Sequence, residues 1–256
     1  MSDQRQSPSV IEATDLTIGW NSPVISNASF TIPRGGVTVL IGPNGSGKST
    51  LLHAITGLLQ PLGGSVQVLG SSPEKVQAKI SYVAQHVNVP YGIPLTVKAT
   101  VAMGRYARVG WLGRMKAEDH RQIQLCMEKL DLMDLSHRHL GELSGGQRQR
   151  VLVAQGIAQE HQILVLDEPL TGLDIGSMRT IDTIIHEETD DGRTVVLTSH
   201  NLEEARAADY VLLLGGGQLL AGEPSQILTT ANLQAAYGLG VHPPKDDLGL
   251  ELPTPH

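Results

Sequence analysis

The hydrophobic residues of this 256-residue chain fall into short runs of strand length. Residues 37–41 and 163–166 are continuous apolar runs, which are typical of parallel strands buried on both faces. Residues 10–18 alternate between apolar and polar positions, as a strand with one solvated face does. The same reasoning predicts strands at 24–32, 65–69, 80–84, 194–198, 211–214 and 218–221, the last two as a hairpin around consecutive glycines.

Helical spacing replaces these strand patterns between about residues 90 and 140. Ile123, Met127 and Leu130 recur on one face of the segment 116–130, which predicts an amphipathic helix. Ser144 offers an N-cap hydroxyl to a second helix over 144–159. Further helices are expected at 49–57, 175–189 and 201–208.

Alternating strands and helices predict an α/β fold with a mainly parallel sheet. We expect one domain over 10–237, in which a helical subdomain at 89–159 interrupts an α/β core formed by 10–88 and 160–237. The first strands are expected to add an antiparallel layer. The two ends, 1–9 and 238–256, are polar or rich in Pro and Gly, which predicts flexible tails.

Composition narrows the classes of function. The chain has 19 Lys and Arg against 26 Asp and Glu, so it lacks the basic footprint of a protein that wraps nucleic acid. Its one cysteine, Cys126, excludes an internal disulfide and is expected to be a small core residue on a helix. No apolar run approaches the roughly 18 residues needed to span a bilayer, and no signal peptide is expected at the start. A membrane role is therefore expected to depend on a partner.

Residues 42–50, Gly-Pro-Asn-Gly-Ser-Gly-Lys-Ser-Thr, fit the phosphate-loop pattern in full. Glycines allow backbone N–H groups to turn around a β-phosphate, and the following helix directs its positive dipole end at the same anion. Lys48 is expected to reach the β- and γ-oxygens, and the Ser49 hydroxyl to ligate Mg²⁺. The predicted nucleotide-binding residues are Gly42, Pro43, Asn44, Gly45, Ser46, Gly47, Lys48, Ser49 and Thr50.

Asp167 and Glu168 directly follow the apolar run 163–166. A carboxylate that ends a strand beside a phosphate loop can hold Mg²⁺ through water, which is the role predicted for Asp167. Glu168 is expected to point at the attacking water, as general base or as the group that orients and polarises it.

A second anion site is predicted at Ser144, Gly145, Gly146 and Gln147. The serine hydroxyl and the glycine amides open a helix, where free N–H groups and the helix dipole favour an anion. Because the phosphate loop already has its own helix, this second site makes sense if it serves the γ-phosphate held by another subunit. Two ATP molecules sandwiched in a head-to-tail dimer would follow.

The phosphate loop, the Leu-Ser-Gly-Gly-Gln string at 143–147 and the Asp-Glu-Pro at 167–169 resemble the ATP-binding subunits of ABC transporters, and the resemblance covers nearly all of 10–237. It implies a P-loop NTPase (RecA-like) core and an ATPase that uses ATP and Mg²⁺. Gln85 matches the Q-loop glutamine, which touches Mg²⁺ or water, and His200 matches the switch histidine at the γ-phosphate.

The resemblance also assigns Asp174 to the D-loop at the dimer interface, and Trp20 to the position that stacks on adenine. The implied partners are a second copy of the chain, integral-membrane permease subunits and, indirectly, an extracytoplasmic substrate-binding protein. The chain would then lie peripherally on the cytoplasmic face of the membrane. The apolar segment 89–97 and the helix after it are expected to line a groove for a short permease helix, the alternative being a buried loop.

Residues 103–114, which open with Met-Gly-Arg-Tyr, look like the corresponding segment of ATPases that serve manganese, zinc and iron importers. Residues 170–174 and 227–238 look like the same branch. We therefore expect a divalent metal as cargo, with ferric chelate, haem or another cargo as the alternative. The other interpretation of the arginine-rich segment is a solvated face without cargo information. A non-transport ABC ATPase fits less well, because the chain has one cassette and no coiled coil, and an unrelated phosphate-loop kinase does not explain 143–147.

Overall fold

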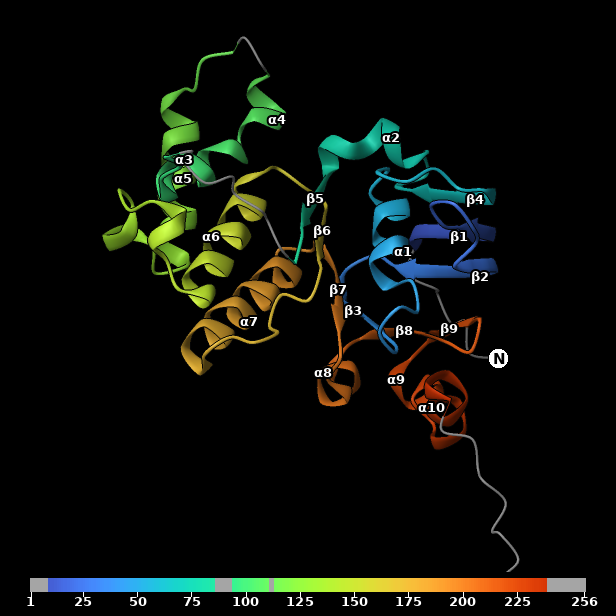
Figure 1. The fold of residues 1–256 in the computed structure, drawn as a ribbon. Coiled ribbons are helices and arrows are strands. Elements are labelled where there is room, and N and C mark those ends of the chain that lie inside the picture. The colour runs from blue at the N-terminus through green and yellow to red at the C-terminus, as the bar shows by residue number, and fades with distance from the viewer. Residues whose placement is uncertain (1–8, 86–93, 111–112, 239–256) are drawn as a thin grey trace, which may run out of the picture.

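The computed structural model describes residues 9–85, 94–110 and 113–238 and arranges them in layers (Figure 1). Within these residues, one sheet has the strand order β2-β1-β4 and the other the order β5-β6-β7-β3-β8-β9. Helices α3 to α7 lie on one side of the larger sheet, and α1 and the smaller sheet lie on the other (Figure 1). The predictions for the end segments 1–8 and 239–256 fall outside the described residues.

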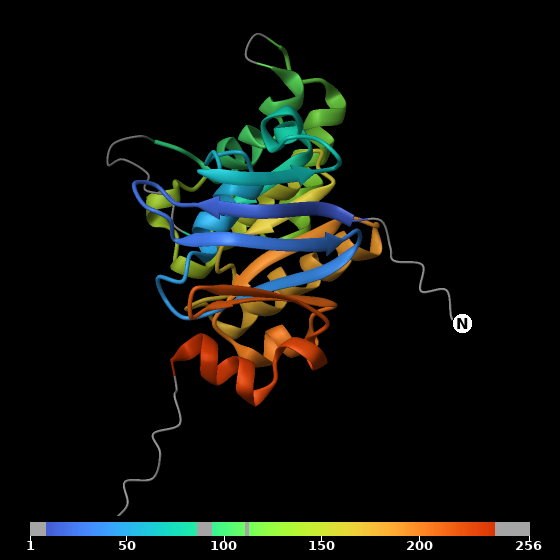
Figure 2. The ribbon, with the colours of Figure 1, turned by 90° about the vertical axis from the view of Figure 1, so that its right-hand side faces the viewer.

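The smaller sheet is the antiparallel layer expected at the N-terminus, and its strands lie side by side in Figure 2. β1 (Ser9–Ile18) pairs with β2 (Ile25–Pro33) on one edge and with β4 (Gly63–Val68) on the other. The register of the β1–β2 pair shifts between Ala13 and Leu16, where Asp15 has a φ of 48°. This irregularity resets the alternation of the strand, so that Leu16 is fully buried.

The larger sheet is parallel except for its last strand. Because parallel strands end at the same edge, the residues after them are brought together. The strand bounds are β3 (Gly36–Ile41), β5 (Ile80–Val83), β6 (Ile163–Leu166), β7 (Thr194–Ser199), β8 (Tyr210–Gly215) and the antiparallel β9 (Gln218–Gly222). The predicted mainly parallel sheet and its terminal hairpin are confirmed.

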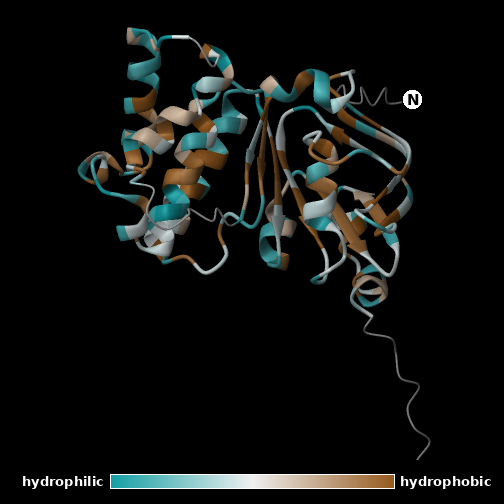
Figure 3. Cartoon of the chain, turned by 45° about the horizontal axis from the view of Figure 1, so that its top comes forward, coloured by the Kyte–Doolittle hydropathy of each residue, from teal (hydrophilic) through white to brown (hydrophobic). Residues whose placement is uncertain are grey.

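Both faces of this sheet are buried, as the continuous apolar runs predicted. Along β3, Leu40 packs toward α1 (Lys48–Ile55) and the smaller sheet, whereas Val39 and Ile41 pack toward the helical layer. Apolar colour accordingly runs along the central strands in Figure 3. Helix α1 is therefore held between two sheets, with the phosphate loop at its first residue.

The helical segment contains α3 (Val97–Met103), α4 (Tyr106–Val109), α5 (Ala117–Lys129) and α6 (Gly145–Ala158). Ile123, Met127 and Leu130, expected on one face, are at most 2% exposed, and Cys126 is buried among them. These side chains share a core with α6, α7 (Ile175–Asp190) and the larger sheet. The inserted segment is therefore helical, as predicted, and its core is continuous with the sheet.

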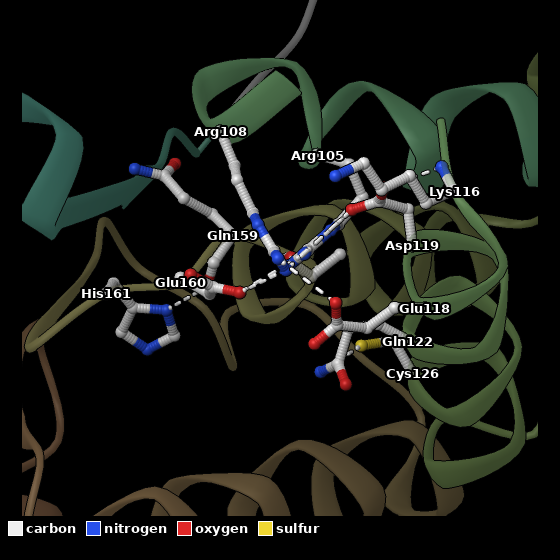
Figure 4. Close-up of polar contacts among 11 residues, drawn as sticks. Arg105, Arg108, Lys116, Glu118, Asp119, Gln122, Cys126, Gln159, Glu160 and His161 are labelled. Atoms are coloured by element: carbon white, nitrogen blue, oxygen red, sulfur yellow. Dashed lines mark hydrogen bonds and ion pairs between the residues drawn. The ribbon is translucent and has the colours of Figure 1, made fainter. Parts of the chain in front are cut away.

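A buried arginine connects the helical segment to the residues that precede β6 (Figure 4). Arg105, between α3 and α4, is 2% exposed. Its guanidinium donates to the Asp119 carboxylate on α5 at 2.9 and 3.1 Å and to the carbonyl of Ala158, the last residue of α6, at 2.8 Å. Glu160 accepts from Arg105 and from Arg108. One side chain thus ties three helices together.

Short helices account for what the sequence pattern did not predict. These are α2 (Pro73–Val76), α9 (Pro224–Ile227), α10 (Thr230–Tyr237) and the single 3₁₀ turns Gln77–Lys79, Met133–Leu135 and Leu140–Glu142. The remaining predicted helix, α8 (Leu202–Ala207), is capped by Asn201. Thr229 caps α10 by accepting from the Asn232 N–H. No helix in the described ranges is long and apolar enough to cross a membrane.

Candidate nucleotide site

The phosphate loop connects β3 to α1, and its glycines meet different constraints. Gly45 and Gly47 have φ values of 77° and 101°, a region that disfavours residues with a Cβ. A Cβ at Gly47 would also lie 2.9 Å from the Val24 side chain. Gly42 has an ordinary φ, but a Cβ there would collide with the backbone carbonyl of Leu214 on β8. The loop is thus folded tightly, with the N-terminus of α1 at its end.

Lys48 is buried, with 7% of its surface exposed. Its Nζ donates to the carbonyl oxygens of Gly42 and Pro43, at 2.8 and 3.1 Å. Burial lowers the pKa of the Lys48 ammonium, and the carboxylates of Glu168 and Asp167 act against that shift. An incompletely solvated cation at the mouth of the loop favours an anionic ligand.

Asp167, directly after β6, is held by a residue that sequence reasoning missed. The Thr198 hydroxyl on β7 donates to Asp167 Oδ1 at 2.7 Å and accepts from the Glu168 N–H, also at 2.7 Å. Asp167 is buried, and Glu168 has a φ of 49°, an unusual conformation for a residue with a side chain. The signal in the sequence is a polar Thr198 within an apolar strand. Together these contacts fix the directions in which the two neighbouring carboxylates point.

Residues that follow three parallel strands meet at the Glu168 carboxylate. Gln85, after β5, donates from Nε2 to Glu168 Oε2 at 2.6 Å. His200, after β7, contacts Glu168 Oε1 through Nε2. The carboxylate is therefore bracketed by an amide and an imidazole.

A cavity of about 460 Å³ joins these groups to the phosphate loop. Its size falls within the range of small-molecule sites. The lining residues are Val24, Asn44, Gly45, Gly47, Lys48, Ser49, Thr50, Gln85, Glu168 and His200. The structure thus brings together most of the predicted phosphate-loop residues and three of the residues predicted around the attacking water.

The residues of the phosphate-loop site suit a nucleoside triphosphate with its metal ion. The Ser46 hydroxyl is buried and has no partner among the described residues, so it is free for a phosphate oxygen. Ser49 is an exposed hydroxyl on the cavity wall, and Gln85 and Asp167 supply further oxygens. Mg²⁺ prefers oxygen ligands and keeps several waters, which fits this sparse donor set.

The predicted second anion site lies apart from this cavity, at the start of α6. Ser144 caps the helix by accepting from the Gln147 N–H at 3.2 Å, and the Gln147 side chain accepts from the Ser144 N–H at 3.0 Å. The two glycines between them differ. A Cβ at Gly146 would lie 2.5 Å from Asp174 Oδ2 and 2.5 Å from Ser177 Oγ, whereas a Cβ at Gly145 would meet no other part of the described structure within 4 Å. The fold of the chain itself therefore explains Gly146 and leaves Gly145 unexplained.

Asp174, predicted at a dimer interface, is the N-cap of α7. Its carboxylate accepts from the backbone N–H of Ser177 at 2.9 Å and from the Ser177 hydroxyl at 2.7 Å. These hydrogen bonds lower the pKa of the Asp174 carboxyl. The carboxylate is held beside Gly146, and the next residue, Ile175, is 67% exposed.

Trp20 follows β1 and is 63% exposed, so it is not a core residue. Its ring packs edge-on against His53 of α1, with ring centroids 6.0 Å apart. Val24, four residues later, lines the phosphate-loop cavity. Trp20 itself is not among the residues that line this cavity, and much of its ring surface is exposed to solvent.

Comparison with known proteins agrees with this geometry. The family model for the ABC transporter domain matches residues 25–171. The chain is 34% identical over 230 residues to the manganese transport system ATP-binding protein MntB of Bacillus subtilis (strain 168), covering 89% of this chain and 92% of the relative. It is also 34% identical over 230 residues to the zinc transport system ATP-binding protein TroB of Treponema pallidum (strain Nichols), covering 89% and 86%.

Solved structures give the same result. The fold is similar to that in an inward-facing conformation of a putative metal-chelate type ABC transporter, with a TM-score of 0.78, 29% identity and coverage of 90% of this chain and 89% of the other. It is also similar to the dimeric post-hydrolysis state of the ATP-binding cassette MJ0796 bound to ADP and Pi, with a TM-score of 0.73, 26% identity and coverage of 84% and 98%. The chain therefore belongs to the ABC transporter family, as an ATP-binding, ATP-hydrolysing subunit.

Proposed function

We propose that this subunit powers the uptake of a divalent metal ion, manganese, zinc or iron, through a separate permease. The observation that carries the proposal is the match to metal-transport ATP-binding proteins along about nine-tenths of the chain. The phosphate loop, Gln85, Glu168 and His200, which line one cavity, support the ATPase step. The cargo itself is selected by other subunits.

In this proposal the phosphate loop binds the triphosphate. Lys48 exchanges its two carbonyl contacts for β- and γ-phosphate oxygens, which are better partners for an ammonium ion. Ser49, Gln85 and Asp167 would hold Mg²⁺, which when bound would neutralise charge that develops on the phosphates. Trp20 offers its open ring to the adenine.

Glu168 acts on the attacking water. Gln85 and His200 each contact one oxygen of its carboxylate, so the direction of Glu168 is set before ATP enters. The carboxylate accepts a proton from the water or polarises it, and His200 is placed to turn from Glu168 to the γ-phosphate.

The site is completed by a second copy of the chain. Ser144 and Gly145 lie outside the cavity of their own subunit and are proposed to close over the γ-phosphate held by the partner. Asp174 and the exposed Ile175 lie next to them and belong to the same proposed interface. ATP binding then favours the closed dimer, and hydrolysis releases it.

The permease is proposed to receive this motion at the cytoplasmic face of the membrane, with an extracytoplasmic binding protein supplying the metal. Gln85 is the last described residue before 86–93, so most of the segment 89–97, proposed as the wall of the permease groove, falls outside the described residues. Its described end continues into α3, which begins at Val97.

Whole-cell uptake of radiolabelled manganese, zinc and iron tests the proposal. A deletion strain is compared with strains that carry the wild-type chain, Glu168→Gln, or Glu187→Gln, which alters a surface carboxylate paired with Lys129. We expect uptake of one divalent metal to be lost in the deletion strain and restored by the wild type and Glu187→Gln only. If only the uptake of a ferric chelate were lost, the proposed cargo would be a chelate and not a free metal ion. Unchanged uptake of every metal would refute metal transport.

A further inference from the structure

A line of side-chain contacts leads from Trp20 to the Asp167 carboxylate through two residues outside the predicted site, His53 on α1 and Tyr82 on β5. The His53 ring lies edge-on to both aromatic rings, with centroids 6.0 Å from Trp20 and 5.6 Å from Tyr82. His53 Nε2 is 3.2 Å from Tyr82 Oη, and Tyr82 Oη is 3.5 Å from Asp167 Oδ2. The four residues come from four separate segments of the chain, so this contact line exists only in the folded protein.

The hydrogens in this line can be assigned from its chemistry. An ionised carboxylate only accepts, so the single Tyr82 hydrogen is donated to Asp167. Tyr82 Oη must then accept from His53, which places the imidazole hydrogen on Nε2. His53 Nδ1 is buried and has no partner among the described residues, which suits a bare nitrogen better than an N–H group.

The position of the Tyr82 side chain is supported by the His53 ring. Tyr82 is half-buried, and the two rings pack edge-on with an angle of 82° between their planes.

Asp167 has a hydroxyl donor on the side of each of its oxygens. Thr198 donates to Oδ1 at 2.7 Å, and Tyr82 approaches Oδ2 from another strand. Two donors on opposite oxygens define the plane of a carboxylate, and lone pairs remain for a water or a cation. The Thr198 contact is short and the Tyr82 contact is long, so the Tyr82 side is where the carboxylate has room to tighten.

We propose that His53 and Tyr82 are positioning residues that orient Asp167 toward the metal ion of the nucleotide, and that Trp20, packed on His53, links the adenine end of the site to this carboxylate. The inference rests on the proposed binding of ATP with Mg²⁺. Neither residue touches the nucleotide in this arrangement. Both act through Asp167, so their removal affects the contribution of the metal to binding more than the binding of ATP alone.

The test is the affinity of the full chain for ATP, measured by isothermal titration calorimetry in excess Mg²⁺ and again in excess EDTA. The ratio of the two affinities reports the contribution of the metal. Tyr82→Phe removes one hydroxyl and is expected to lower this ratio about fivefold, as the loss of one hydrogen bond predicts. Tyr210→Phe removes a phenol hydroxyl at the start of β8 and is expected to leave the ratio unchanged.

Variants of His53 separate positioning from packing. His53→Leu loses the donor and is expected to lower the ratio as Tyr82→Phe does, whereas His53→Gln keeps an N–H near the Nε2 position and is expected to stay within about twofold of wild type. The double variant Tyr82→Phe/His53→Leu is expected to be no worse than either single variant, because both residues act through one carboxylate.

Two results would overturn the inference. An unchanged ratio in Tyr82→Phe removes the positioning role, and if that unchanged ratio comes with an equal loss of affinity in Mg²⁺ and in EDTA, the residue is assigned to folding. A wild-type chain that gains nothing from Mg²⁺ overturns the proposed metal site itself, and this is seen before any variant is compared.

Discussion

Gly145→Ala and Gly146→Ala form a matched pair, because the two neighbouring glycines of the α6 N-terminus have different surroundings. Among the described residues, a methyl group at Gly145 meets no atom within 4 Å apart from its own chain neighbours and the backbone of its helix. Alanine also favours a helix over glycine, by up to about 1 kcal/mol. We therefore expect Gly145→Ala to leave the thermal midpoint unchanged or to raise it by about 2–4 °C.

A methyl group at Gly146, in contrast, would lie 2.5 Å from both Asp174 Oδ2 and Ser177 Oγ. Cβ atoms do not approach oxygens so closely, so either the Asp174 and Ser177 side chains leave the hydrogen bonds that cap α7 or the two helices separate. Overpacking of this kind costs about 1–3 kcal/mol. Gly146→Ala is therefore expected to lower the thermal midpoint, and its loss of activity is expected to accompany a loss of stability.

The functional prediction is that Gly145→Ala abolishes hydrolysis in a stable protein. If the Gly145 amide approaches the γ-phosphate of the partner subunit, a methyl group displaces that oxygen. The removal of one preorganised donor from a transition state costs about 10²–10³-fold in kcat. Thermal unfolding and phosphate release are measured on the same samples. Wild-type hydrolysis by Gly145→Ala would refute the assignment of this glycine to the partner's ATP.

Further predictions concern single groups. Glu168→Gln is expected to reduce turnover by about 10²–10⁴-fold while an ATP-bound dimer accumulates in size-exclusion chromatography, and full activity would refute the role of Glu168. Trp20→Ala is expected to weaken ATP binding modestly with unchanged stability, whereas unchanged affinity in calorimetry would remove the adenine contact. Arg105→Met removes the two guanidinium hydrogen bonds to the buried Asp119 carboxylate and leaves it only the Lys116 N–H and the more distant Arg108, so it is expected to destabilise the chain by about 3 kcal/mol in urea unfolding, with a much smaller loss for the half-exposed Arg108→Met. The N–H of Lys116, and then Arg105, lower the pKa of the Asp119 carboxyl, so its stabilising effect is present above its unfolded pKa and is lost as pH falls through the folded value. At neutral pH we therefore expect Asp119→Asn to have a lower thermal midpoint than the wild type, and we expect this difference to shrink below about pH 4.

The fold followed from the sequence where apolar patterning is strong. The run 163–166 corresponds to Ile163–Leu166 in full, and the helical face of Ile123 and Met127 is buried as expected. α10 was not predicted because its hydrophobic residues show almost no amphipathic pattern over eight residues. Its boundaries depend on the Thr229 cap and on packing against β8.

The site was only partly predictable for a different reason. The phosphate loop and the pair Asp167–Glu168 are local strings, so the sequence indicates them directly. The Thr198 bridge and the His53–Tyr82 contact join residues that are about thirty positions apart, and no local pattern encodes such contacts. Gly145 and Gly146, at the start of α6, cannot be told apart in the sequence, because they differ only in the residues that surround them in the fold.

Each chain is proposed to supply half of each ATP site, and a mixing experiment tests this division. Lys48→Ala removes the phosphate-loop cation, and Gly145→Ala blocks the proposed contact with the partner's ATP, so each purified variant is expected to be inactive alone. In a mixed head-to-tail dimer, one site combines the intact phosphate loop of one chain with the intact Gly145 of the other, so the mixture should regain about a quarter of wild-type phosphate release. A mixture as inactive as its two components would contradict the shared site.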